Sequence, residues 1–100
     1  MGEYIIKISE AVDNVPMHDI KFTDKDDQSA KLQIYDEVEK DVNYTHHKSY
    51  NEGDEYTASL FRIINNKEED IRMPVIAFTL KNGVCHWLTN KIKFDNKDKS

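Results

Sequence analysis

The sequence has little of the material that several common classes of protein require. Among its 100 residues are one cysteine, three glycines and two prolines, so it can form no internal disulfide and has too few glycines for a glycine-rich phosphate loop. It also contains no G-x-S-x-G, C-x-x-C or H-E-x-x-H motif, the local signatures of common nucleophiles and metal sites. These absences favour binding over catalysis, and we expect no enzyme activity, no cofactor and no bound metal.

Long apolar segments and a leader sequence are missing as well. No run approaches the roughly 20 apolar residues that a membrane helix needs. Residues 1–14, MGEYIIKISEAVDN, carry no basic flank and no small-residue cleavage site, so we expect no signal peptide. A single cysteine suits a reducing compartment. We therefore expect a cytoplasmic protein that makes no contact with a membrane.

What the chain does contain is sufficient for one folded domain. Its residues are 38% hydrophobic and 10% aromatic, which is enough for one core and too much for a disordered chain. We expect a single globular domain over residues 1–94. The last residues, 95–100, read DNKDKS and should form a mobile polar tail.

Apolar and polar residues alternate along several segments, a pattern that predicts β-strands. The predicted strands are 3–9, 18–23, 29–35, 56–65, 71–80 and 84–94, the last being one strand or a pair. The polar segment 24–28 would join two of them as a hairpin, and 66–70 would form a turn. Asn82-Gly83 suits a tight type I′ turn, which needs positive φ angles. Pro74 cannot donate a hydrogen bond and must lie at a bulge, at an edge or where its nitrogen faces outward.

Residues 36–43 fit two kinds of structure. Ile34, Val38 and Val42 are four residues apart, as on one face of a helix, and they also satisfy the alternation of a strand. We therefore predict a mainly β fold of about six strands, arranged as an antiparallel sandwich or a small barrel. The alternative is an α+β sheet with one face covered and one short helix near 36–43.

The segment 41–56, DVNYTHHKSYNEGDEY, is the most suggestive of chemistry. His46 and His47, with Cys85 and His86 from a later strand, would supply the nitrogen and sulfur ligands that zinc prefers. Neighbouring residues of an extended chain point to opposite faces, however, so neither pair can reach one ion unless the chain bends. We interpret these residues as loop histidines and a half-buried strand pair, and predict no metal site.

Charge is distributed unevenly along the chain. Residues 1–56 hold 14 Asp or Glu against 6 Lys, a net charge of −8, whereas residues 57–100 hold 5 against 8 Lys or Arg, a net charge of +3. An acidic first half opposes direct binding of nucleic acid and attracts a protein with a basic surface. Tyrosines among these carboxylates would add contact area. The candidate partner-binding residues are Asp24, Asp26, Asp27, Asp36, Glu37, Glu39, Asp41, Tyr44, Tyr50, Glu52, Asp54 and Glu55.

These features lead to two functional hypotheses. The first is a small, acidic, non-enzymatic binding protein that inhibits a nucleic-acid-binding protein because its carboxylates mimic phosphates. Two arginines against twelve lysines are typical of AT-rich coding sequence and point to a low-GC bacterium or its phage. The alternative is a small enzyme or ligand carrier. Carboxylates gathered in one stripe would favour the first hypothesis, and a pocket lined by His46, His47, His86 and tyrosines would favour the second.

Overall fold

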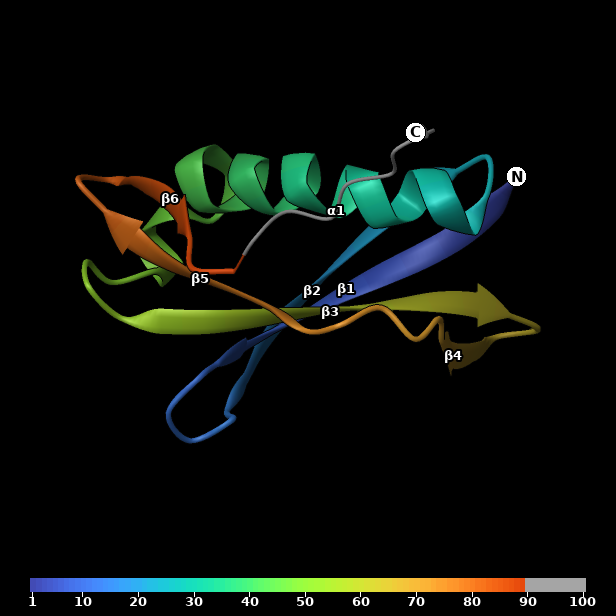
Figure 1. Cartoon of the computed structure of the whole chain (residues 1–100), viewed down its shortest axis with the longest axis horizontal. Coiled ribbons are helices and arrows are strands. Elements are labelled where there is room, and N and C mark those ends of the chain that lie inside the picture. The colour runs from blue at the N-terminus through green and yellow to red at the C-terminus, as the bar shows by residue number, and fades with distance from the viewer. Residues whose placement is uncertain (90–100) are drawn as a thin grey trace, which may run out of the picture.

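The fold is one antiparallel sheet with a helix across one of its faces (Figure 1). The computed structural model describes residues 1–89. Its elements are β1 (Gly2–Glu10), β2 (Pro16–Asp24), α1 (Asp27–Lys40), β3 (Glu55–Ile64), β4 (Lys67–Asp70), β5 (Ile76–Lys81) and β6 (Val84–Trp87). After α1 the chain continues in a π-helical turn, η1 (Asp41–Thr45), and a short 3-10 turn, η2 (His47–Ser49). Within these residues no helix has both the length and the apolar character needed to cross a membrane.

The prediction of a mainly β fold with about six strands is confirmed. Of the arrangements considered, the structure has the α+β one, in which a helix covers one face of a single sheet. The strand order is β2-β1-β3-β5-β6. The end of the predicted last strand, 90–94, and the predicted tail, 95–100, lie outside the described residues.

β4 and β5 are two halves of one interrupted strand. Both lie along the same side of β3, with β5 opposite Glu55–Ala58 and β4 opposite Phe61–Ile64. The unpaired residues 71–75 between them include Pro74, which has no N–H to donate. The strand predicted over 71–80 therefore begins only at Ile76. The turn predicted over 66–70 is shorter, because Asn65 and Asn66 adopt positive φ angles of 52° and 65° and Lys67 already starts β4.

The strand predicted over 29–35 is wrong, because these residues lie within α1. The side chain of Asp26 accepts a hydrogen bond from the Ser29 N–H at 2.8 Å and so caps the helix start. Ala30, Ile34 and Val38 then share one buried helical face, with exposed fractions of 0%, 1% and 0%. Leu32, which alternation would place beside Ala30 and Ile34, is 45% exposed. The helix is thus longer than predicted and starts before residue 36.

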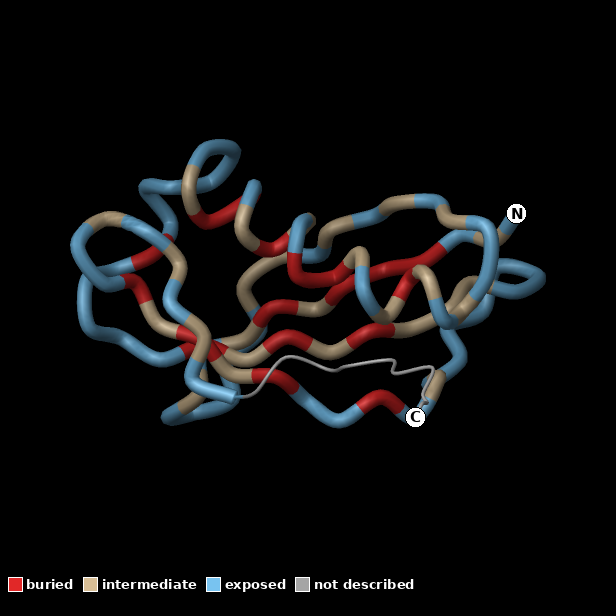
Figure 2. Tube along the Cα trace, turned by 45° about the horizontal axis from the view of Figure 1, so that its top comes forward, coloured by how far each residue is buried: buried red, intermediate tan, exposed pale blue. Residues whose placement is uncertain are grey.

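The core lies between α1 and the central strands, where the buried positions of Figure 2 run in parallel rows. The sheet contributes Tyr4, Ile6 and Ile8 from β1, Tyr56, Ala58 and Leu60 from β3, and Ile76, Phe78 and Leu80 from β5. Each set is spaced by two residues, as expected for one face of a strand. Burial of this apolar surface is the main force that holds α1 against the sheet.

The tight turn between β5 and β6 gives a test of the fold. Gly83 has a φ of 79°, and a Cβ added there would meet no atom within 4 Å. We expect Gly83→Val to lower the free energy of unfolding by about 1–3 kcal/mol through backbone strain alone. The measurement is urea unfolding followed by circular dichroism. Lys81→Val, at an exposed position of β5, is the control, and equal losses in the two variants would contradict the turn assignment.

Candidate functional site

The feature that distinguishes this molecule is a buried carboxylate at the C-terminal end of α1. Asp41 is 4% exposed and is the only buried charged residue in the described part of the chain. A buried carboxylate is costly unless hydrogen-bond donors surround it. Asp41 therefore requires a set of donors, and their positions define the site.

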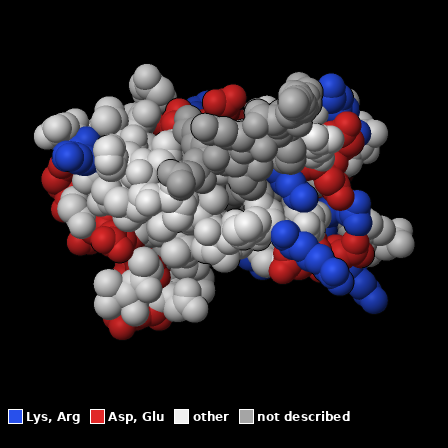
Figure 3. Space-filling view, in the orientation of Figure 1, with Lys and Arg blue, Asp and Glu red and all other residues white. Residues whose placement is uncertain are grey.

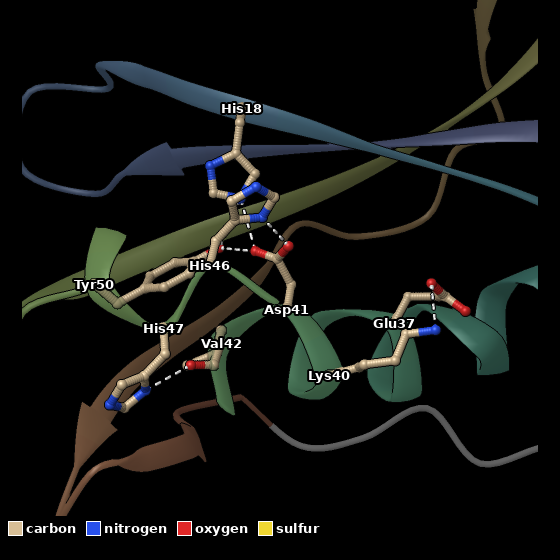
Figure 4. Close-up of polar contacts among 8 residues, drawn as sticks. All are labelled: His18, Glu37, Lys40, Asp41, Val42, His46, His47 and Tyr50. Atoms are coloured by element: carbon tan, nitrogen blue, oxygen red, sulfur yellow. Dashed lines mark hydrogen bonds and ion pairs between the residues drawn. The ribbon is translucent and has the colours of Figure 1, made fainter. Parts of the chain in front are cut away.

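Three side chains donate to the Asp41 carboxylate (Figure 4). His46 Nδ1 lies 2.6 Å from Oδ1. His18 Nε2 and the Tyr50 hydroxyl each lie 2.7 Å from Oδ2. The Tyr50 hydroxyl is also 3.2 Å from His18 Nε2. Two imidazoles, a phenol and a carboxylate thus meet at one point.

Separate elements bring these four residues together. His18 comes from β2, while Asp41 opens the π-helical turn η1. The backbone N–H of His46 donates a hydrogen bond to the Asp41 carbonyl at 2.8 Å. These residues are five positions apart, the spacing of a π-turn, and the turn brings the His46 ring back to the Asp41 side chain. Single π-turns of this kind are frequent at functional sites. Tyr50 follows η2 and is buried, with 4% exposure.

The contacts shift the proton affinities of the buried groups. Burial by itself would raise the pKa of the Asp41 carboxyl, but hydrogen bonds from His46, Tyr50 and His18 outweigh it and lower this pKa below its usual range. Burial, together with the neighbouring Asp41 charge, strongly raises the pKa of Tyr50. The carboxylate is therefore ionised and the phenol is protonated at neutral pH.

The site is open to solvent on the His46 side. The His46 side chain is 49% exposed, against 22% for His18 and 5% for Asp41. A cavity of about 180 Å³ adjoins Asp41 and His46, and its rim includes Glu37 and Lys40 of α1. A small ligand can reach His46 from this cavity without opening the core.

The histidine ring next in sequence does not take part. His47 Nδ1 bonds to the Val42 carbonyl at 3.0 Å and not to Asp41 (Figure 4). His47 instead lines a second cavity of about 360 Å³, together with Tyr44 and the outer side of His46. The second sequence hypothesis called for a pocket lined by His46, His47, His86 and tyrosines. This cavity contains the two histidines and Tyr44, whereas His86 lies on β6 and does not line it.

For two of the candidate partner-binding residues, the structure corrects the prediction that they lie at the surface. Asp41 and Tyr50 were expected at a surface, but both are 4% exposed and bond to each other. Tyr44, in contrast, is 78% exposed. Sequence reasoning missed His18, because it stands 23 positions from Asp41 in the chain and shares no ligand spacing with it.

Most of the candidate carboxylates on α1 and beside it make contacts within the fold. Asp26 caps α1, and Asp27 accepts hydrogen bonds from the Tyr4 hydroxyl at 2.7 Å and from Arg62 at 2.8 Å. Glu39 accepts a hydrogen bond from the Trp87 indole at 2.6 Å. Asp24 accepts one from the Lys25 N–H, and Glu37 accepts one from Gln33. Asp36 is exposed on α1.

The remaining candidates lie near the start of β3. Glu52 accepts hydrogen bonds from the backbone N–H groups of Asn82 and Gly83, at 2.5 and 3.1 Å, and so holds the β5–β6 turn. Asp54 and Glu55 are exposed and line a small cavity with Glu10. The candidate carboxylates therefore occupy separate places instead of one stripe.

No family model, no curated protein and no solved structure matches this chain.

The Asp41 network makes a stability prediction with a defined pH dependence. We expect Asp41→Asn to lower the free energy of unfolding at pH 7 by about 2–4 kcal/mol, because Asn keeps only one acceptor oxygen and places an NH₂ donor where the other stood, which leaves donors of the site unpaired. Since the folded-state pKa of Asp41 is lowered, this excess stability is complete above the unfolded pKa of about 3.9 and disappears as the pH falls through the folded-state pKa.

The measurement is urea unfolding of parent and variant between acidic and neutral pH. Asp36→Asn on the exposed side of α1 is the matched control and should cost less than about 0.5 kcal/mol. A difference between parent and Asp41→Asn that grew on acidification would contradict the assignment.

Proposed function

We propose that this chain is a small metal-binding protein in which His18, Asp41 and His46 hold a divalent transition-metal ion. One observation carries the proposal: the two ring nitrogens and a carboxylate oxygen all lie within 4.8 Å of one another. Two imidazoles and one carboxylate are a ligand set used for zinc and for non-haem iron. Calcium and magnesium prefer oxygen ligands alone and suit this set less well.

The distances are close to those that a bound ion requires. Zinc ligands lie about 2.0–2.2 Å from the metal and hence about 3–3.5 Å from one another. His18 and His46 approach different oxygens of the same carboxylate at 2.7 and 2.6 Å. To reach the separation of zinc ligands, each ring nitrogen would have to move away from its carboxylate oxygen by less than about 1 Å.

The surroundings favour an ion with room for one further ligand. The Tyr50 hydroxyl fixes the orientation of Asp41 Oδ2, the role that outer hydrogen bonds play around metal ligands. His46 faces a cavity of about 180 Å³, which leaves space for water or a small anion at a fourth position. From the sequence we predicted no metal site, because the ligands considered there were His46, His47, Cys85 and His86 and not His18.

Metal titration tests the proposal. After treatment with chelator, the parent should bind one equivalent of Zn²⁺ or Co²⁺, with Co²⁺ giving visible absorption bands that report on the ligands. His46→Ala should weaken binding by about 100-fold or more, since even the loss of an outer partner costs about 10- to 100-fold. Binding should weaken on acidification, because protonated imidazole is not a ligand.

His47→Ala is the matched control, because His47 is the adjacent histidine and bonds to a backbone carbonyl instead. It should bind the metal like the parent. Circular dichroism checks that each variant is folded. Equal losses in the two variants, or no binding by the folded parent, would overturn the proposal.

A second candidate function is inhibition of a protein with a basic, nucleic-acid-binding surface. The observation that favours it is the group of exposed carboxylates formed by Glu10, Asp54 and Glu55. Figure 3 shows acidic side chains over the end of the molecule where β3 begins and the β1–β2 loop projects. Such a group would accelerate encounter with a basic partner, and salt would weaken it.

The test is the association rate with a partner captured at low salt, with and without competing DNA. Asp54→Lys combined with Glu55→Lys should slow association about ten-fold or more, whereas Asp36→Lys on α1 should change it little. Unchanged rates in the double variant, or a partner without a basic site, would refute this function.

A further inference from the structure

β2 forms a long, free edge of the sheet. Among the described strands it pairs with β1 alone. Its range is Pro16–Asp24, and its pairing with β1 is regular from His18 to Asp24, whereas Pro16 and an irregularity at Met17 interrupt the start of the strand. An edge of this length presents a row of backbone N–H and C=O groups that a further strand can pair with.

The core is incompletely covered beside this edge. Ile20 and Phe22 pack against the core but are only partly buried. Their direct neighbours across the ladder on β1, Ile6 and Tyr4, are 0% and 2% exposed. Covering the outer side of β2 would therefore bury apolar surface that the single chain leaves accessible to water.

A hollow runs next to the middle of the strand. The cavity of about 180 Å³ that adjoins the Asp41 site is lined on its other side by Asp19 and Ile20 of β2. An apolar side chain from a strand docked on β2 would lie over this hollow beside Ile20.

We propose that two copies of this chain pair antiparallel through their β2 edges, about a two-fold axis at Ile20. In this register His18 lies opposite Phe22 of the second copy, so residues 18–22, within the regular part of β2, are paired. Asp19 lies opposite Lys21 of the second copy, and Lys21 lies opposite its Asp19. The dimer therefore contains two cross-strand pairs of opposite charge.

Charge selects this register over its neighbours. The two opposed residues of an antiparallel pair point their backbone groups either both toward the partner strand or both away from it, so registers can differ only in steps of two. An axis at Asp19 would set that carboxylate against its own copy, and an axis at Lys21 would oppose two ammonium groups. Of the three registers, the axis at Ile20 is the one that sets Asp19 opposite Lys21.

The dimer joins the two sheets into one and brings the Ile20 side chains together at the axis. Because the contact consists of one strand from each copy, it is smaller than a standard protein interface. We therefore expect a reversible dimer that is populated at high micromolar concentration. The pairing is independent of metal, and its test is carried out in the presence of chelator.

The test uses charge reversal on the full chain, followed by sedimentation velocity up to about 1 mM protein, a range that covers weak association. In a dimer of the Asp19→Lys variant, both cross-strand pairs consist of two lysines. In a dimer of the Lys21→Asp variant, both pairs consist of two aspartates. Each variant alone should dimerise about ten- to thirty-fold more weakly than the parent. An equimolar mixture of the two variants should recover the affinity, because each heterodimer again has two pairs of opposite charge.

Asp36→Lys and Lys81→Asp carry the same charge changes at exposed positions away from β2. Alone or mixed, they should dimerise like the parent. A folded parent that stays monomeric at about 1 mM, single β2 variants that associate as tightly as the parent, or a mixture that fails to recover would each overturn the proposal.

Discussion

The carboxylate of Asp41, held inside the molecule, constrains the whole end of the fold around it. A buried charge must be surrounded by donors, and the donors come from β2, from the turn after η1 and from the segment after η2. Through them one side chain ties the C-terminal end of α1 to an edge strand of the sheet. The π-helical turn η1 lies between Asp41 and His46 and brings the His46 side chain back to this carboxylate.

The same arrangement gives the site its chemical character. Its ionised carboxylate and Tyr50 are buried and His18 is partly buried, while His46 remains half exposed. If the network were fully enclosed, no ligand could reach it. If it were fully exposed, water would compete for its hydrogen bonds. The combination leaves a fixed negative group with two imidazoles at a surface that small ions can reach, which is why we favour metal binding among the functions considered.

The acidity of the first half of the chain has a largely structural explanation. Asp26 caps α1, and Asp27 accepts hydrogen bonds from Tyr4 and Arg62. Glu52 accepts a hydrogen bond from the backbone of the β5–β6 turn. These contacts satisfy donors of the helix start, of two strand side chains and of a tight turn. A count of charges along the sequence does not separate such carboxylates from those that face a partner. Asp54 and Glu55 are exposed, and we assign them to a partner only in the second candidate function.

The sequence alone determined the features that depend on neighbouring residues. Alternation located β1, β2 and β3, and Asn82-Gly83 located the β5–β6 turn, because strand pleat and turn angles are local properties. Alternation failed over 29–35, where Ala30 and Ile34 satisfy both a strand and a helix. Only packing against the sheet decided that Leu32 points outward. The site likewise depends on the tertiary structure, because His18 and Asp41 stand 23 positions apart in the sequence. No local pattern links residues that meet only after β2 and α1 pack together.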